Sequence, residues 1–301
     1  MPRLSIIIPF RADISNFEDT LLSVLENRPE SCEIIVPHDG RYADPYRLAD
    51  EVEFVCCDPE TSTTGLLNAG LYASRSPFVN VVLEGATVRS GWSDEACKLL
   101  EESQNISTVA VALNYEGRTG YGVDPRCLTN SSSLRSGHVD SQRASRTALA
   151  PAMGCGFYRQ STLLEIGGWN SYLDVCSADV ELSWILDSLE MRCAVSSIPA
   201  LPTSFAMIPR HLDLQSLHCL GAIAKAFGIY DDRFTTKLTG LIAGLFSGGL
   251  ARTHAWNQGA PNQPLVLSIT QRLSAARKAL ETDCPPPAIL SWPQKALRRA
   301  A

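Results

Sequence analysis

The chain has 301 residues, of which 45% are hydrophobic and 19% are charged, so it can bury a sizeable core and its composition excludes a mainly disordered protein. Its net charge of −6 and its scattered Lys and Arg residues argue against nucleic acid as a partner. No apolar stretch reaches the ~20 residues of a membrane-spanning helix, and the apolar run 4–8 is too short for a signal peptide, so we expect a cytoplasmic protein with no transmembrane segment.

Strand and helix signals alternate along the first hundred residues. Apolar, mostly β-branched runs predict strands at 4–10, 32–37, 52–57 and 77–83, and apolar residues at helical spacing predict helices at 13–25 and 65–75. Such alternation predicts βαβ units and a parallel sheet. Ligands bind at the carboxyl ends of the strands in such sheets, where Arg11, Asp39, Asp58 and Glu84 all fall.

The alternation then breaks and is replaced by helices. A helix at 92–103 and a strand at 107–113 precede a segment, 115–149, that is rich in Gly, Ser, Asn and Arg and has no periodicity, which predicts a long surface excursion. After it we expect a strand at 153–159, helices at 161–168 and 177–191, and a strand at 192–199. Beyond residue 211 the sequence predicts helices at 212–229, 232–250 and 268–281, followed by an extended proline-rich segment at 282–294. We therefore divide the chain into a main domain, 1–210, and a helical extension, 211–301, that packs on it.

Five segments of the chain resemble, in sequence and spacing, the family 2 glycosyltransferases of the GT-A fold. They are "LSIIIPFR", "EIIVPHDG", "GLLNAGLYASRSPFVNVVLEGA", "GCGFYRQSTLLEIGGWN" and "SADVELSWIL", and the resemblance covers residues 4 to about 200. It implies an α/β protein whose mostly parallel sheet is flanked by helices. It also implies transfer of a sugar from a nucleoside-diphosphate sugar to an acceptor hydroxyl, usually with inversion, and a divalent cation, Mn²⁺ or Mg²⁺, on the diphosphate.

The resemblance assigns five residues to the nucleotide. Pro9 and Phe10 match the end of the first strand, where the backbone cups the base, and Arg11 can offer a forked donor to the ring or the phosphates. Asp39 matches the second Asp of the family's Asp-Asp-Gly, which accepts from the base N3–H in uridine-dependent members. Asn68 matches a residue on the helix that packs under the nucleotide.

The metal motif departs from the family pattern. Family members end the strand that corresponds to 78–83 with Asp-x-Asp, because a divalent cation bound to a diphosphate needs hard oxygen ligands. This chain has Glu84, Gly85 and Ala86 at those positions, so the second carboxylate is missing. Glu84 could still hold a cation that is already bound to the donor, and His211 lies where several relatives place a histidine on the metal or the diphosphate. The metal is therefore expected to be weakly held or absent.

Asp179 is the candidate catalytic base. It matches the Asp of the family's Glu-Asp motif, which takes the proton from the acceptor hydroxyl, whereas Ala178 replaces the Glu. Asp179 and Glu181 are two residues apart and cannot share a helix face, so one of them points away from the cleft.

Structural interpretations remain open for each of these residues. Glu84 could cap a turn, Asp39-Gly40 could be an ordinary turn pair, Asp179 could serve the helix dipole, and His211 could be a surface histidine. The alternative to an enzyme is accordingly a catalytically impaired GT-A-like protein that acts as a nucleotide-sugar-binding or scaffolding module. The sequence identifies neither the sugar, the base nor the acceptor, and the apolar segment 238–250 leaves a homodimer open.

Overall fold

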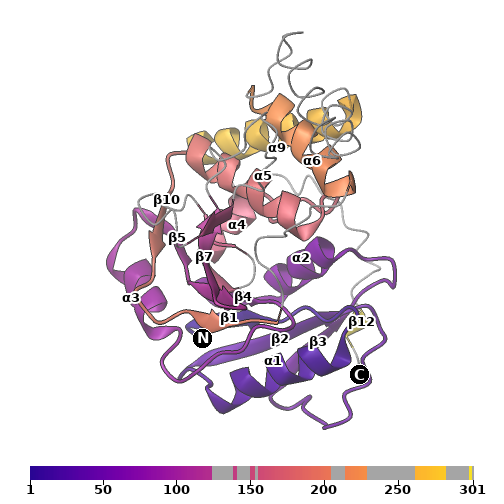
Figure 1. Ribbon diagram of the computed structural model, residues 1–301, viewed down its shortest axis with the longest axis vertical. Helices are drawn as coiled ribbons and strands as arrows, with labels where there is room; N and C mark the ends of the chain where they lie inside the picture. Colours follow the sequence, from indigo (N-terminus) through magenta and orange to yellow (C-terminus); the bar gives the residue numbers. More distant parts are fainter. Residues whose placement is uncertain are drawn as a thin grey trace.

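A central sheet organises the protein. The computed structural model describes residues 1–123, 138–140, 150–152, 155–204, 214–228, 262–282 and 298–299. Among these residues eight strands form one sheet in the order β10-β5-β9-β4-β1-β2-β3-β12 (Figure 1). Their bounds are β1 (Leu4–Ile7), β2 (Cys32–His38), β3 (Val52–Cys56), β4 (Phe78–Val82), β5 (Ile106–Ala110), β9 (Cys155–Arg159), β10 (Arg192–Val195) and β12 (Arg298–Arg299).

The strand pairing confirms the predicted mostly parallel sheet. β1 runs parallel to β2 and β4, β2 runs parallel to β3, and β10 runs parallel to β5, whereas β9 is antiparallel to β4 and β5 and β12 is antiparallel to β3. Every residue of β1 and β4 is buried. This burial on both faces explains why their sequences are nearly continuous apolar runs.

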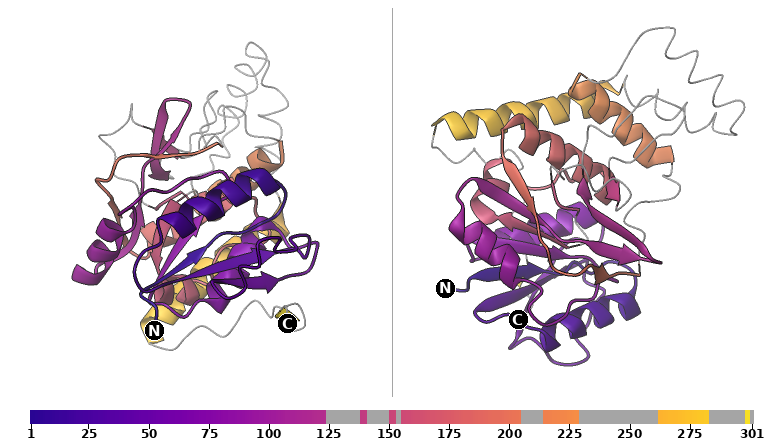
Figure 2. Two further views of the ribbon diagram at one scale, coloured as in Figure 1. Left: turned by 90° about the horizontal axis from the view of Figure 1, so that it is seen from below. Right: turned by 60° about the vertical axis from the view of Figure 1, so that its left-hand side comes forward.

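Helices cover both faces of the sheet (Figure 2). The helices α1 (Ile14–Glu26) and α3 (Asp94–Glu102) cover one face, and α2 (Thr63–Ala73), α4 (Gln160–Glu165) and α5 (Val175–Ser188) cover the other. Alternate residues of the first strand serve the two layers, since Leu4 and Ile6 pack on the α1 side and Ile7 packs on the α2 side. Gly70 lets α2 approach β1 closely, because a Cβ there would collide with Ile7.

The helical C-terminal region lies on the α5 side of the molecule. α6 (Leu214–Ala226) and α9 (Gln263–Thr282) stack above α5, farthest from α1 (Figure 2). Their residues Leu217, Ile223 and Ile269 belong to the same apolar cluster as residues of α2 and α5. The predicted helix 232–250 and nearly all of the predicted extended segment 282–294 lie outside the described residues, and so does the predicted domain boundary at 210/211.

The segment from residue 115 is more regular than the sequence predicted. The strand expected at 107–113 divides into β5 and β6 (Leu113–Tyr115), and β6 forms a hairpin with β7 (Arg118–Val123). β8 (His138–Asp140) and β11 (Leu201–Pro202) complete a second sheet in the order β11-β6-β7-β8. The hairpin turn, Glu116-Gly117, has positive φ at both positions, as a two-residue hairpin turn requires, so the expectation of an irregular excursion was wrong here.

Where the described residues are concerned, none of the helices combines the length and the apolarity that crossing a membrane requires.

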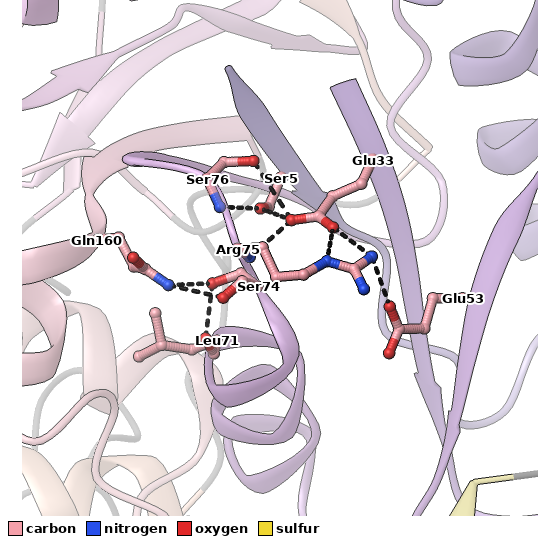
Figure 3. A network of polar contacts seen from close by, with 8 residues as sticks. All are labelled: Ser5, Glu33, Glu53, Leu71, Ser74, Arg75, Ser76 and Gln160. Carbon is pink, nitrogen blue, oxygen red and sulfur yellow. Dashed lines mark hydrogen bonds and ion pairs between the residues drawn. The ribbon is translucent and has the colours of Figure 1, made fainter. Parts of the chain in front are cut away.

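A polar network joins the strands at the amino-terminal edge of the sheet (Figure 3). Glu33 of β2 accepts from the Ser5 hydroxyl of β1, and from the N–H and the guanidinium of Arg75 just before β4. The same guanidinium reaches Glu53 of β3 at 2.9 Å. Burial alone would raise the pKa of Glu33, but the donors of Ser5 and Arg75 hold that pKa below its ordinary value.

The lowered pKa of Glu33 predicts a pH-dependent contribution to stability. The contribution is complete above the ordinary glutamate pKa, near 4.5, and is lost as the pH falls through the lower pKa of the folded state. We expect Glu33→Gln to lower the free energy of unfolding by about 2 kcal/mol at neutral pH and by less in acid, measured by urea unfolding across this pH range.

The matched control for this prediction is Glu102→Gln, which removes an exposed carboxylate paired with Lys98 on α3. It should change the stability by less than about 0.5 kcal/mol at any pH. Identical unfolding curves for Glu33→Gln and the unmodified protein would contradict a stabilising network.

Candidate functional site

The loops that follow the parallel strands lie together at the carboxyl edge of the sheet. β1, β2, β3 and β4 run in the same direction, so the segments after Ile8, His38, Cys57 and Val82 leave the sheet on one side. This edge carries Arg11, Asp39 and Glu84, as the sequence predicted from strand order.

Asp39 is held by Arg41. Its side chain is 1% exposed, and its carboxylate accepts from the backbone N–H of Arg41 at 3.2 Å and from Nε of Arg41 at 2.8 Å. Nη2 of Arg41 also reaches the carboxylate, and it donates to the backbone carbonyl of Arg11 at 2.6 Å. The Arg41 side chain is 63% exposed, so one end of the pair is buried and the other faces solvent.

The electrostatics keep Asp39 ionised. Burial alone would raise the pKa of its carboxyl, but the hydrogen bonds from Arg41 and the charges of Arg41 and Arg11 together hold the pKa below its ordinary value. Arg41 was missed in the sequence analysis, although an arginine directly after an Asp-Gly turn, two residues from the Asp, is well placed to pair with it.

Arg11 connects the loops after β1 and β3. Its guanidinium donates to the backbone carbonyl of Thr61, just before α2, while its own carbonyl accepts from Arg41. The loops after β1, β2 and β3 are therefore joined through two guanidinium groups.

Pro9 and Phe10 lie buried at the end of the first strand. Both side chains are buried, and the Phe10 ring packs against Phe17 and Tyr42 with ring centroids 5.0 and 5.3 Å apart. The Phe10 N–H donates to the Pro37 carbonyl at 2.9 Å, which continues the pairing of β1 and β2 past the end of the first strand.

Glu84 lies in the turn after β4. Gly85 has a φ of 94°, and its N–H donates to the Thr20 hydroxyl of α1 at 2.8 Å, which fixes the turn against that helix. Glu84 itself is half-buried, and its Oε2 is buried without a hydrogen-bond partner among the described residues. Burial raises the pKa of Glu84, and the backbone N–H groups of residues 11 to 13 act in the opposite direction.

The surroundings of Glu84 do not match a divalent-metal site. Ala86, at the position of the family's second carboxylate, is 0% exposed and packs in the apolar cluster with Phe10, Val82 and Val88. The described part of the chain contains no group of three His, Cys, Asp or Glu side chains that could hold a metal ion. His211 lies outside the described residues, so the metal role assigned to it and to Glu84 stays a prediction.

Asp179 lies inside α5 and not at its start. The helix begins at Val175, one half-turn before the predicted residue 177, and its N-cap is Asp174, whose side chain accepts from the Ser177 N–H at 3.0 Å. Asp179 is 2% exposed. Burial first and the charge of Asp179 second raise the pKa of Tyr158 in β9 well above its ordinary value, so the two side chains lie close together.

Glu181 faces different partners from Asp179. It is fully buried and accepts from Asn170 at 3.0 Å and from Nε of Arg272 at 3.1 Å. Arg272 belongs to α9 and also donates to the carbonyl of Gly168 at 2.8 Å. The pair therefore fastens the C-terminal helix to α5 and to the turn before it.

Asn68 joins α2 to the same turn. Its side-chain amide donates to the Trp169 carbonyl at 2.7 Å, and its side-chain oxygen accepts from the Trp169 N–H at 2.8 Å. The amide is fully buried and both of its groups are used. Its contact with the nucleotide stays a prediction, whereas its link between α2 and the segment leading to α5 is an observed contact.

Two solved structures are similar to this chain. One is mannosyltransferase PcManGT from Pyrobaculum calidifontis in complex with GDP-Man and Mn²⁺, which is 13% identical with a TM-score of 0.52, over 94% of this chain and 88% of that one. The other is TarS of S. aureus, residues 1–349, which is 13% identical with a TM-score of 0.54, over 93% and 91% of the two chains. No protein-family profile and no curated protein sequence matches the chain.

These likenesses confirm the predicted fold class. The chain has the α/β architecture of the GT-A fold, with a mostly parallel sheet between helices and a helical C-terminal region. An identity of 13% shows the fold alone, so the chemistry has to be argued from the residues at the carboxyl edge.

The contact between Asn68 and residues 168–169 can be tested with two glycines. Gly168 and Gly117 both have positive φ, 71° and 77°, so replacement by alanine strains the backbone equally at either position, by about 1 kcal/mol. A Cβ at position 168 would also collide with Oδ1 of Asn68, whereas one at position 117 meets nothing within 4 Å.

We expect Gly168→Ala to lower the free energy of unfolding by about 1–3 kcal/mol more than Gly117→Ala, because Asn68 must give up a buried hydrogen bond. Chemical denaturation of the two variants measures the difference. Equal losses would mean that the turn absorbs the added methyl group without disturbing Asn68.

Proposed function

We propose that the protein is a glycosyltransferase that moves a sugar from a nucleoside-diphosphate sugar to an acceptor hydroxyl, with inversion at the sugar carbon. The observation that carries the proposal is the meeting of Arg11, Asp39 and Arg41 at the carboxyl edge of a GT-A sheet. Carboxyl edges of this kind bind ligands. The similar mannosyltransferase was solved with GDP-Man and Mn²⁺, which supports a nucleotide-sugar donor for this chain.

The base is assigned to the edge formed by Pro9, Phe10 and Asp39. Pro9 and Phe10 end the first strand beside Asp39, whose ionised carboxylate is a strong acceptor for a base N–H. Asn68 fixes α2 through its two hydrogen bonds to Trp169. We keep it as a candidate for a further contact with the nucleotide sugar.

The transfer itself needs a base and stabilisation of the leaving group. Asp179 takes the proton from the acceptor hydroxyl, the acceptor oxygen bonds to the sugar carbon, and the bond from that carbon to the donor oxygen breaks with its electron pair going to the β-phosphate. Asp179 is buried, and its charge acts on Tyr158 of β9. A positioned carboxylate is suited to accept a proton from a hydroxyl. The acceptor is not identified by these residues.

Binding of the nucleotide is the first test. In calorimetry with a panel of nucleoside diphosphates, at least one should bind with a Kd below about 1 mM, and Asp39→Ala should weaken that binding about tenfold or more because a charged acceptor is lost. Asp50→Ala is the control, since Asp50 is an exposed carboxylate in the turn before β3. The absence of any binding would overturn the proposal.

Loss of the base is the second test. With the donor identified by binding and a panel of sugar acceptors, Asp179→Asn should lower kcat by about 10²- to 10⁴-fold while donor affinity stays within about twofold. Asp187→Asn, which removes another carboxylate from α5, should leave both unchanged. Full transfer activity in Asp179→Asn would exclude Asp179 as the base. Donor binding without transfer to any acceptor would instead support the catalytically impaired binding module.

A further inference from the structure

Within the described ranges, the turn after β4 brings only one carboxylate, that of Glu84, to the carboxyl edge of the sheet. Ala86 stands where the family motif has its second metal ligand. Its methyl side chain is buried in an apolar cluster and carries no oxygen that could bind a metal ion. The turn is also fixed from both sides, since the Gly85 N–H donates to Thr20 and the Thr87 N–H donates to the Pro202 carbonyl. A cation held here would have Glu84 as its protein ligand, whereas magnesium sites usually supply one or two carboxylates as well as substrate oxygens.

Glu84 has an acidic neighbour, Asp13, whose charge acts on it. The Asp13 carboxylate already caps α1, where it accepts from the backbone N–H of Asn16 at 3.0 Å and from the side-chain amide of Asn16 at 2.6 Å. A divalent ion at Glu84 would therefore have to compete with a helix cap for its second carboxylate.

Positive charge is supplied at the same edge by two arginines. The Arg41 guanidinium donates to the backbone carbonyl of Arg11, the Arg11 guanidinium donates to the carbonyl of Thr61, and both charges act on Asp39. Asp39 neutralises only one of the two. The Arg41 side chain is 63% exposed and can turn toward a ligand, and a planar guanidinium offers forked donors that match phosphate oxygens.

We propose that the guanidinium groups of Arg11 and Arg41, instead of a divalent cation, neutralise the diphosphate of the donor and of the departing nucleoside diphosphate. The proposal rests on the proposed function. Arg41 would leave Asp39 as it turns to the phosphates, and the freed carboxylate oxygen would then accept from the base N–H, so base and diphosphate recognition are coupled. As the bond to the sugar breaks, the electron pair on the β-phosphate oxygen is stabilised by guanidinium donors.

Calorimetry on the full chain with UDP and GDP, in EDTA and in about 1 mM Mn²⁺, tests the proposal. We expect the affinity of whichever diphosphate binds to agree within about twofold in the two conditions. Arg11→Ala and Arg41→Gln should each weaken diphosphate binding about tenfold or more, yet weaken binding of the corresponding nucleoside by less than about threefold. Arg41→Gln keeps an amide donor for the buried Asp39, and thermal unfolding of each variant verifies that it is folded.

Matched variants complete the experiment. Arg28→Ala, which removes an arginine from an exposed ion pair with Glu51, should leave affinity unchanged. Glu84→Gln tests the metal alternative directly, since a loss of affinity in Mn²⁺ but not in EDTA would show that Glu84 holds a metal ion and would overturn the inference.

Two further results would overturn the inference and leave the proposed function standing: diphosphate binding that EDTA abolishes, or binding that is indifferent to both arginine variants. Binding of neither nucleotide in either condition would overturn the proposed function itself, and the inference with it.

Discussion

The paired hydrogen bonds between Asn68 and Trp169 are the contact on which the relation between the two halves of the site depends. α2 belongs to the half of the site that we propose for the nucleotide, since it follows the loop that Arg11 contacts, and Trp169 begins the segment that leads to α5 and Asp179. Both groups of a fully buried amide are used, so any sliding of α2 past the turn would leave buried polar groups without partners. Arg272 secures the other side of the turn through Glu181 and the Gly168 carbonyl, which makes the C-terminal helix α9 part of the same support.

At the carboxyl edge of the sheet, charged side chains hold one another in place, whereas apolar packing has little part there. Asp39 is buried and ionised only because two guanidinium groups lie beside it, and the exposed arginine of the pair is the one that can move. A buried carboxylate loses its compensation when its partner leaves, so a ligand that draws Arg41 away must also give Asp39 a donor. In the function that we propose, recognition of a base and recognition of a diphosphate would therefore be parts of one exchange of hydrogen bonds at this edge.

The sequence predicted the sheet because β1 and β4 are buried on both faces, which leaves nearly continuous apolar runs in the chain. It also predicted that Arg11, Asp39 and Glu84 share an edge, since that follows from strand order alone. The β6–β7 hairpin was missed, because Glu116-Gly117 is a weak turn signal within a stretch without alternation. The partners of Asn68 and Glu181 could not be foreseen, since Trp169 and Arg272 are about a hundred residues distant in the chain and local periodicity carries no information on such pairs.

The turn after β4 shows how one fold can keep a carboxylate while changing what it does. A carboxylate at this position can bind a cation or accept hydrogen bonds from backbone N–H groups. A small divalent ion loses water when it binds, so it needs a second hard ligand in addition to this carboxylate. The side chain of residue 86 determines whether that second ligand is present. The methyl group of Ala86 packs in the apolar cluster around Phe10, so position 86 supplies no second metal ligand. The loop after β1, which the Glu84 carboxylate faces, carries Arg11. Under our proposal, the positive charge that a diphosphate requires would come from the protein itself, through Arg11 on that loop.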